Sequence, residues 1–195
     1  MNFFTNKIVK DFYWSLVFIL SMYAIINNPI THPKPQQTPG DWSIQLIQHP
    51  LLLGLAGHNY LVLSDQDGEI VSELHGLATD SETGKWKYIG ADKTDKLQVW
   101  KFDGARSYLR EKNYPGIILN QGNYSQVIDL WNKALSCKNE INQKYIPYPP
   151  LGLSFNGDTE NSNSAAYTLA LCIGLDVKHI GLFTPGSKNN LLDSN

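Results

Sequence analysis

The segment Gly57–His75 constrains the fold of this chain more than any other part, because it has the pattern of two strands joined by a short turn. His58–Ser64 and Glu69–His75 are rich in the aromatic and aliphatic residues that favour strands. Asp65–Gly68 between them has the Asp and Gly residues that favour a turn. We therefore expect an antiparallel β-hairpin, around which the rest of the domain is built.

The hairpin places two histidines on one face of the sheet in either of two registers. With Gln66–Asp67 as the loop, His58 lies directly opposite His75. With Asp67–Gly68 as the turn, His75 instead faces Tyr60, and the first histidine lies diagonally away. Because side chains alternate between the two faces of a strand, these three side chains share a face in both registers.

Two imidazoles on one face, with Glu73 beside them, are suitable groups for general-base chemistry. Directly opposite residues bring their Cβ atoms to within about 5 Å, so the histidines can couple, or Glu73 can support one of them. A histidine held in this way has the defined tautomer that a catalytic base requires. Two alternatives stay open: half-buried histidines with backbone partners, or a metal site completed by Glu73, Asp80 or His179.

Other runs along the chain predict further strands and two helices. Strands are expected over 43–47, 85–89, 97–102 and 115–119. One helix is expected over 123–145, with Ser125 as its cap, and a second over Ser162–Ile173. The proline-rich segment 145–152 is expected to be a rigid connector. Together these elements predict an α+β domain over residues 41–195, with an antiparallel sheet packed against two main helices.

Residues 1–30 contain an uncharged apolar run, Phe12–Ile26, preceded by Lys7 and Lys10. This order predicts an N-terminal hydrophobic helix that acts as a signal anchor, or as a signal peptide if it is cleaved. The run is shorter than the roughly 20 residues of a typical span, so a buried N-terminal helix is the alternative. Residues 31–40 are rich in proline and polar residues and predict a linker. The basic flank predicts a membrane-anchored domain on the extracytoplasmic (periplasmic) side, or a secreted one after cleavage.

Charge and cysteine content exclude two kinds of partner. The chain carries 16 basic and 18 acidic residues, a net charge of −2, which gives no electrostatic basis for binding nucleic acid. Cys137 and Cys172 are the two cysteines, and they lack the C-x-x-C spacing of thiolate metal sites. They can form a disulfide in an oxidising compartment or remain two separate thiols, and the sequence leaves both open.

The segment Asn161–Ser164 lies where the second predicted helix begins. The first turn of a helix has free N–H groups and a partial positive charge, which favour an anionic nucleophile and can hold an oxyanion. Ser162 or Ser164 would be this nucleophile, with Asn161 and Asn163 beside it. The alternative is that these residues only cap the helix, since Asn and Ser are preferred caps.

These parts, in this order, resemble the circularly permuted papain-like fold of the lecithin retinol acyltransferase-like and permuted NlpC/P60 families, over about residues 42–175. In those families the site combines a histidine on one strand, a second polar residue on the next strand and an Asn-Cys motif at a helix N-terminus. His58 matches the first position, His75 the second and Asn161–Ser162 the third. The resemblance implies Ser162 as nucleophile, His58 as base and His75 as the orienting residue. The residues expected to support them are Asn161, Glu73, Tyr60, Asn163 and Ser164.

The chain departs from the family pattern by having serine in place of the cysteine nucleophile. A cysteine thiol has a pKa of about 8.5 and ionises readily beside a histidine. A serine hydroxyl loses its proton only during attack and therefore needs a closely placed base. Cys172 lies ten residues further on, nearly three turns into the helix, and does not replace the missing thiol.

Two functions follow from these residues. The first is a cell-envelope hydrolase or acyltransferase that acts, without a cofactor or metal, on an amide or ester of a peptidoglycan peptide or a lipid. The second is a catalytically inactive, membrane-anchored domain of the same fold. Such a domain would bind a peptide or glycan through aromatic residues such as Trp86, Tyr88 and Trp100. A third possibility is an unrelated α+β fold that keeps Ser162 away from His58.

Overall fold

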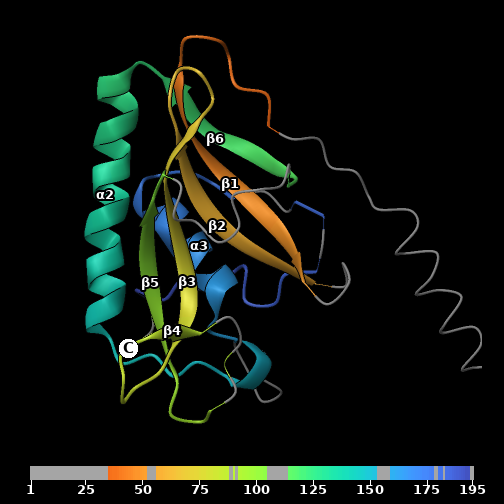
Figure 1. The fold of residues 1–195 in the computed structure, drawn as a ribbon, viewed down its shortest axis with the longest axis vertical. Coiled ribbons are helices and arrows are strands. Elements are labelled where there is room, and N and C mark those ends of the chain that lie inside the picture. Colours follow the sequence, from red (N-terminus) through yellow and green to blue (C-terminus); the bar gives the residue numbers. More distant parts are fainter. Residues whose placement is uncertain are drawn as a thin grey trace, which may run out of the picture.

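The computed structural model describes residues 35–51, 56–87, 90, 92–104, 114–152, 159–177, 180–181 and 183–193. These residues form a six-stranded antiparallel sheet and two α-helices, which confirms the predicted α+β class (Figure 1). The predicted N-terminal hydrophobic helix lies outside the described residues, as do Tyr88 and His179. No helix among the described residues is long and apolar enough to cross a membrane.

The strands follow the predicted order along the chain, and all except β4 are longer than predicted. They are β1 (Trp42–Leu51), β2 (Ala56–Ser64), β3 (Ile70–Thr79), β4 (Trp86–Lys87), β5 (Lys96–Asp103) and β6 (Gly116–Gly122). In space the order is β4-β3-β2-β1-β6, with β5 also paired to β3. The strand expected over 85–89 is described only as the short β4.

Strand β3 changes partner along one of its edges. Strand β5 pairs with one edge of β3 over Ser72–Thr79. The other edge pairs with β2 as far as Leu74, and with β4 from Ala78 onward. Between these two ladders β2 and β3 are no longer paired, and we call this separation the fork. His75 and Gly76 lie on β3 at the fork.

The β2–β3 register is the second of the two predicted registers. Leu61 pairs with Leu74 and Val62 with Glu73, and a bulge follows near Ser64. Continued beyond the last ladder pair, this register brings Tyr60 level with His75, and their rings stack with centroids 4.1 Å apart.

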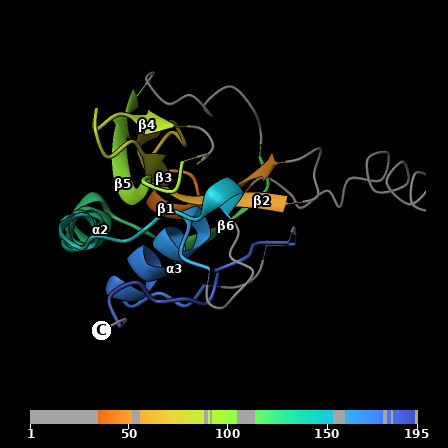
Figure 2. The same cartoon turned by 90° about the horizontal axis from the view of Figure 1, so that it is seen from below.

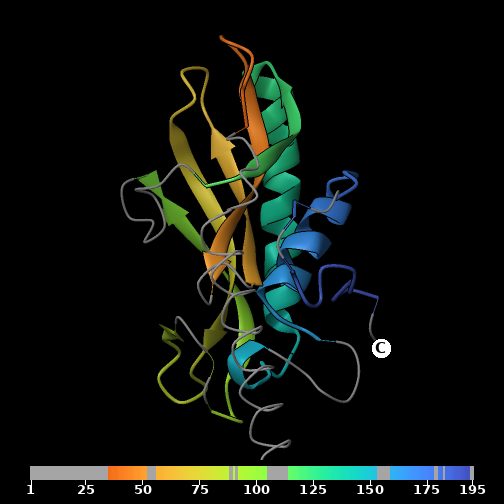
Figure 3. The ribbon, with the colours of Figure 1, turned by 90° about the vertical axis from the view of Figure 1, so that its right-hand side faces the viewer.

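The two faces of the sheet have different partners. One face packs against the helices through a buried apolar core, whose members include Ile44, Leu46, Leu61, Leu63, Leu74, Val127, Trp131, Ala165 and Leu169. Both helices cover this face, as seen from below in Figure 2 and from the side in Figure 3. The opposite face carries a smaller buried cluster of Ile47, Tyr60 and Val62. By strand parity, His58 and His75 lie on this second face.

Helix α2 spans Tyr124–Gln143 and begins earlier than its predicted cap. Asn123 is the N-cap, and its side chain accepts a hydrogen bond from the Gln126 N–H at 3.1 Å. The prediction of Ser125 as the cap was wrong because this residue already lies inside the first turn. Pro150–Gly152 in the predicted connector forms a short 3-10 turn, η3.

Helix α3 spans Ser162–Cys172 and starts at the predicted residue. A disulfide joins Cys172 at its C-terminal end to Cys137 on α2. Of the two alternatives left open by the sequence, the structure therefore has the disulfide. This bond connects the two helices that cover the sheet and fixes α3, whose N-terminus carries the candidate nucleophile.

The described end of the predicted linker is attached to the sheet. Gln37 accepts a hydrogen bond from the Ser43 hydroxyl at 2.7 Å and donates one to the Asp65 carbonyl at 2.5 Å. It also donates to the carbonyl of Asp41. The end of the predicted linker is therefore bound to the sheet before β1 begins.

Candidate active site

The first turn of α3 lies at the fork between β2 and β3. The side-chain carbonyl of Asn163 accepts a hydrogen bond from the backbone N–H of Asn59 at 2.9 Å. On β3, a Cβ placed at Gly76 would lie 3.0 Å from the Cα of Ser162 and 2.5 Å from the Cβ of Ala165. Asn59 follows His58, and Gly76 follows His75. Because neighbouring residues of a strand point to opposite faces, the helix N-terminus packs against the backbone next to both histidines, on the face opposite their side chains.

The two histidines and Glu73 form a buried chain of hydrogen bonds. His58 Nε2 lies 3.1 Å from His75 Nδ1, and His75 Nε2 lies 2.9 Å from a carboxylate oxygen of Glu73. All three residues are buried. When Glu73 is ionised it can only accept, so His75 donates from Nε2 and accepts at Nδ1 from His58. This order leaves the lone pair of His58 on Nδ1, where a base would receive a proton.

Burial keeps both imidazoles neutral. It lowers the pKa of His58 well below the ordinary value, and the neighbouring His75 and His49 lower it further. It also lowers the pKa of His75 to about 3, with a further contribution from His49. The Glu73 carboxylate favours a protonated His75, but burial outweighs it. Both rings are therefore unprotonated at neutral pH, which is the state a general base needs.

Aromatic rings hold the histidines from both sides. The Tyr60 ring stacks on His75 at 4.1 Å and on His58 at 5.8 Å between centroids. The edge of Phe102 on β5 contacts His75 at 5.5 Å. Tyr60 thus packs against both histidines, and Phe102 adds a ring contact that the sequence analysis missed.

His49 is a third histidine of this face that the sequence analysis missed. It pairs directly with His58 in the β1–β2 register, and its ring contacts Tyr114 at 4.5 Å. It is half-buried, unlike its neighbour. The sequence contained a signal for this residue. The first strand was predicted to end at residue 47; a strand extended by two residues would have placed His49 on the same face as Ile47.

Ser162 has a different hydrogen-bond partner from the one that a catalytic triad requires. It is buried at the start of α3, and its hydroxyl and backbone N–H interact with the phenol of Tyr148. No hydrogen bond joins Ser162 to His58 or His75 within the part of the chain that the structure describes. The structure therefore brings the two histidines and Glu73 together on one face of the sheet and places Ser162 with α3 on the other face.

The remaining N–H groups of the first turn are occupied by the helix cap. Asn161 accepts from the N–H of Asn163 at 2.8 Å and from that of Ser164 at 3.3 Å, while its backbone carbonyl accepts from Ala165 at 3.0 Å. The Ser164 hydroxyl donates to the Thr159 carbonyl at 2.7 Å. Asn161 and Ser164 thus form a capping box, and among the two candidate serines only Ser162 remains suited to nucleophilic attack.

Tyr148 is a site residue that the sequence analysis missed. A Cβ at Gly90 would lie 2.5 Å from the Tyr148 ring, and one at Gly152 would lie 3.2 Å from its hydroxyl, so two glycines make room for it. Burial raises the pKa of its phenol, and the hydrogen bonds from Ser162 counteract part of this rise. The phenol therefore keeps its proton and can donate a hydrogen bond. The feature of the sequence that could have indicated this residue is an aromatic side chain within the rigid proline-rich connector.

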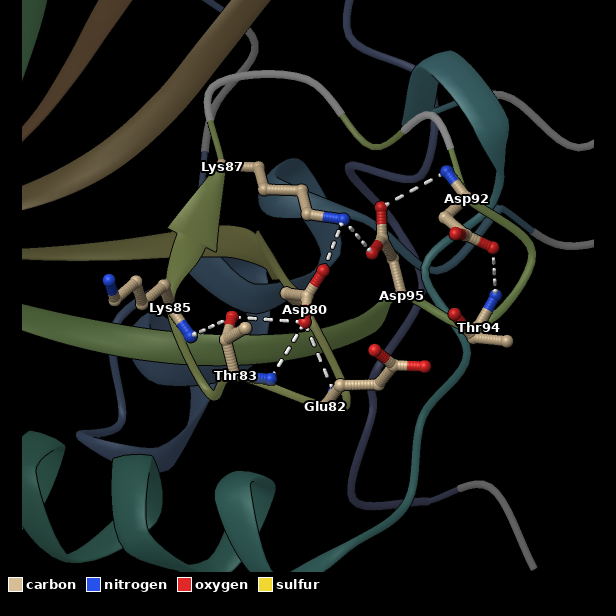
Figure 4. Close-up of polar contacts among 8 residues, drawn as sticks. All are labelled: Asp80, Glu82, Thr83, Lys85, Lys87, Asp92, Thr94 and Asp95. Atoms are coloured by element: carbon tan, nitrogen blue, oxygen red, sulfur yellow. Dashed lines mark hydrogen bonds and ion pairs between the residues drawn. The ribbon is translucent and has the colours of Figure 1, made fainter.

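Asp80, an alternative metal ligand in the sequence analysis, belongs to a separate polar cluster (Figure 4). The Lys87 ammonium lies 2.8 Å from Asp80 and 2.7 Å from Asp95. Asp80 also accepts hydrogen bonds from the N–H groups of Glu82 and Thr83 in the turn before β4. Among the described residues, no group of three or more His, Cys, Asp or Glu side chains is arranged to hold a metal ion.

Comparison with known proteins found no match to the chain among protein-family models, curated proteins or solved structures.

Proposed function

We propose that the domain is a cell-envelope hydrolase or acyltransferase with a permuted papain-like fold, acting on an amide or ester carbonyl. The observation that carries the proposal is the buried His58–His75–Glu73 chain at the fork, with the α3 N-terminus packed against the backbone of the same positions from the other face of the sheet. A buried carboxylate–imidazole–imidazole chain is costly to fold, and such groups concentrate at functional sites.

In the proposed reaction Ser162 attacks the carbonyl carbon while His58 Nδ1 takes the hydroxyl proton. His75 and Glu73 stabilise the imidazolium that forms, and His58 then returns the proton to the leaving amine or alcohol as its bond breaks. Water hydrolyses the resulting acyl-serine, or a second alcohol or amine accepts the acyl group. The step requires the Ser162 side chain to turn from Tyr148 and to reach through the fork to His58 on the other face of the sheet, at a position where β2 and β3 form no ladder pair.

The developing oxyanion would be held by Ser162 and Tyr148. The Ser162 N–H now points to the Tyr148 phenol. A carbonyl oxygen that entered between them would accept from that N–H and from the protonated phenol.

We place the domain outside the cytoplasm, held at the membrane by the N-terminal segment. The Cys137–Cys172 disulfide supports this placement, because disulfides persist in oxidising compartments. The net charge of −2 gives no support for a nucleic-acid partner.

The test is covalent labelling of the full chain with a fluorophosphonate probe, followed by mass spectrometry. We expect label on Ser162, about 100-fold slower labelling in His58→Ala, and none in Ser162→Ala. Ser125→Ala, an exposed serine of α2, is the matched control and should label like the natural chain. Label that persists in Ser162→Ala would contradict the proposal.

The second candidate is an inactive binding domain of the same fold. One observation favours it: the hydroxyl and N–H of Ser162 are both engaged by Tyr148 rather than by a histidine. Ser162→Cys separates the candidates, because a thiol beside a histidine ionises readily. If neither the natural chain nor Ser162→Cys reacts with its matching probe, fluorophosphonate or iodoacetamide, the binding function is supported.

A further inference from the structure

A turn over Asp92–Asp95, which we call the β5 turn, leads into β5 and ends in a buried carboxylate. Asp95 is 1% exposed, and one of its carboxylate oxygens lies 2.7 Å from the Lys87 ammonium (Figure 4). The other oxygen accepts a hydrogen bond from the Asp92 N–H at 3.2 Å. Because a buried carboxylate is costly to fold without such partners, the β5 turn depends on the ion pair with Lys87.

The backbone of the β5 turn holds the proline-rich connector that carries Tyr148. The Asp95 carbonyl accepts a hydrogen bond from the Tyr148 N–H at 2.8 Å, and the Leu97 N–H donates to the Ile146 carbonyl at 2.8 Å. An isolated antiparallel bridge lies between these two bonds. The connector is therefore paired with the start of β5, and the residue that binds Lys87 also binds the backbone of Tyr148.

A second attachment lies on the ring side of Tyr148. The Leu151 N–H donates to the Gly90 carbonyl at 2.8 Å. A Cβ at Gly90 would lie 2.5 Å from the Tyr148 ring, so the ring occupies the space that a side chain would need there. Leu151 has a φ of 58°, in the left-handed region, which costs a branched residue about 1–2 kcal/mol. The connector therefore follows a path that the surrounding contacts enforce.

The phenol of Tyr148 lies at the first turn of α3. It interacts with the hydroxyl and the backbone N–H of Ser162. The Gly152 carbonyl, at the end of the connector, accepts a hydrogen bond at 2.8 Å from the side-chain amide of Asn161, the α3 cap. The connector is thus attached to the β5 turn at one end and to the helix cap at the other, and the position of the phenol depends on both attachments.

Lys87 connects the β5 turn to β3. Its ammonium also lies 2.8 Å from Asp80, which directly follows β3. Asp80 is itself fixed by hydrogen bonds from the N–H groups of Glu82 and Thr83 at 3.1 and 2.8 Å. Figure 4 shows the Lys87 ammonium between the carboxylates of Asp80 and Asp95. This cation therefore joins the β5 turn to the sheet.

We propose that Lys87 and Asp95 are positioning residues that hold the Tyr148 phenol at Ser162. The ion pair fixes the β5 turn, the turn fixes the connector through its backbone, and the connector directs the phenol. This inference rests on the proposed function, because it concerns the oxyanion-binding group of the same site. Both residues act through Tyr148 and take no part in proton transfer.

Removal of the Lys87 charge is the sharpest perturbation, because Asp95 then stays buried without its ion-pair partner. The β5 turn has to open so that water reaches this carboxylate, and the acceptor of the Tyr148 N–H moves with it. The ion pair of Lys101 and Asp103 on β5 provides the matched control. Its atoms lie 2.8 Å apart, but its side chains are 37% and 65% exposed, and an exposed ion pair contributes little.

The test is fluorine NMR of the full chain with its 10 tyrosines replaced by 3-fluorotyrosine. The Tyr148 resonance is the one that is lost in Tyr148→Phe. In Lys87→Met we expect this resonance to move toward those of exposed tyrosines, and the pKa of the phenol to fall, because burial raises it in the natural chain. Lys87→Arg, whose guanidinium also binds carboxylates, and Lys101→Met should both retain the natural spectrum.

A second measurement connects the phenol to the reaction. Fluorophosphonate labelling of Ser162 should be about tenfold slower in Lys87→Met, a smaller effect than that of removing the phenol in Tyr148→Phe. The natural rate is expected in Lys87→Arg and in Lys101→Met. If Lys87→Met does not fold, the double variant Lys87→Met/Asp95→Asn removes both charges and is measured in the same way.

Three results would overturn the inference: an unchanged Tyr148 resonance in Lys87→Met, an equal shift in Lys101→Met, or labelling of Ser162 at the natural rate although the resonance has moved. The spectrum requires no reaction, so the two proposals can be separated. A shifted Tyr148 resonance that Lys87→Arg restores, in a chain whose Ser162 never labels, supports the positioning role of Lys87 and contradicts the proposed chemistry.

Discussion

The side chain of Asn163 on α3 accepts a hydrogen bond from the backbone N–H of Asn59 on β2 at 2.9 Å. This bond forms beyond the end of the β2–β3 ladder, so the Asn59 N–H is bound by a helix side chain instead of a carbonyl of the neighbouring strand. This contact joins the N-terminus of α3 to the residue that follows His58. The Asn163 side-chain amide is therefore one of the contacts that position α3 at the candidate site.

Replacing Asn163 with alanine should weaken the fold. The Asn59 N–H would lose its partner in a buried position, and the Asn163 contact to the Pro185 carbonyl would also be lost. We expect the free energy of unfolding to fall by about 1–3 kcal/mol in urea titrations. Asn132→Ala, an exposed site on α2, is the control and should change it by less than about 0.5 kcal/mol. Equal effects would show that the contact is unimportant.

Gly76→Ala should displace the first turn of α3. The new methyl group would lie 2.5 Å from the Cβ of Ala165 and 3.0 Å from the Cα of Ser162, and the latter is backbone that cannot swing aside. We expect a loss of about 1–3 kcal/mol in unfolding free energy, measured by chemical denaturation. Adding Ala165→Gly should recover part of the loss, because it removes the closer of the two clashes. Full additivity of the two substitutions would contradict this packing.

The buried histidines should make stability fall in mild acid. Burial lowers the pKa of His58, and lowers that of His75 to about 3, below the ordinary value of 6.5. Between these values the unfolded chain binds protons that the folded chain does not, so stability is full above the ordinary pKa and decreases as pH falls below it. We expect a decrease of about 1.4 kcal/mol per pH unit for each histidine between about pH 6.5 and 4.5.

The control for acid sensitivity is the double variant His58→Gln/His75→Gln, whose urea midpoint should vary much less over this range. Asp80 does not contribute to the change in stability over this pH range. Its pKa is lowered by the hydrogen bond from Lys87, so its contribution is lost only below its ordinary value of 3.8. A natural chain with a flat profile down to about pH 4.5 would show that the histidines are not buried as neutral groups.

Reduction of the disulfide should destabilise the domain. The Cys137–Cys172 bond closes a loop of 35 residues, and the chain-entropy model assigns such a loop about 4 kcal/mol. We expect dithiothreitol to lower the urea midpoint accordingly. The double variant Cys137→Ser/Cys172→Ser should resemble the reduced protein and show no response to dithiothreitol. A response in that variant would mean that the reductant acts elsewhere.

Tyr148→Phe should reduce activity more than stability. It removes the phenol that engages the N–H and hydroxyl of Ser162 and keeps the ring that packs near Gly90 and Gly152. We expect kcat/KM to fall about 100-fold, as for loss of one oxyanion donor, with about 1 kcal/mol of stability lost. Tyr167→Phe, a half-buried tyrosine of α3, should alter neither. An unchanged kcat/KM in Tyr148→Phe would remove this residue from the mechanism.

Local pattern was sufficient for most of the fold. Strand composition and turn residues predicted the β2–β3 hairpin, and the helix-capping preference of Asn and Ser predicted the start of α3 at Ser162. The cap of α2 was assigned to Ser125 instead of Asn123, because two good capping residues stood close together and only the backbone conformation distinguishes them. Strand bounds were also longer than predicted, which is why His49 was missed.

The sequence by itself predicted that His58, Tyr60, Glu73 and His75 share one face, because the two registers that its turn residues allow differ by two residues and therefore keep the same side-chain parity. Only the tertiary structure decided which register the hairpin adopts, that Cys137 meets Cys172, and that Ser162 faces Tyr148. These relationships depend on packing between residues far apart in the chain. The close packing of α3 against Gly76 and Asn59 produces no repeating pattern in the sequence, so it could not be predicted from a single strand or helix.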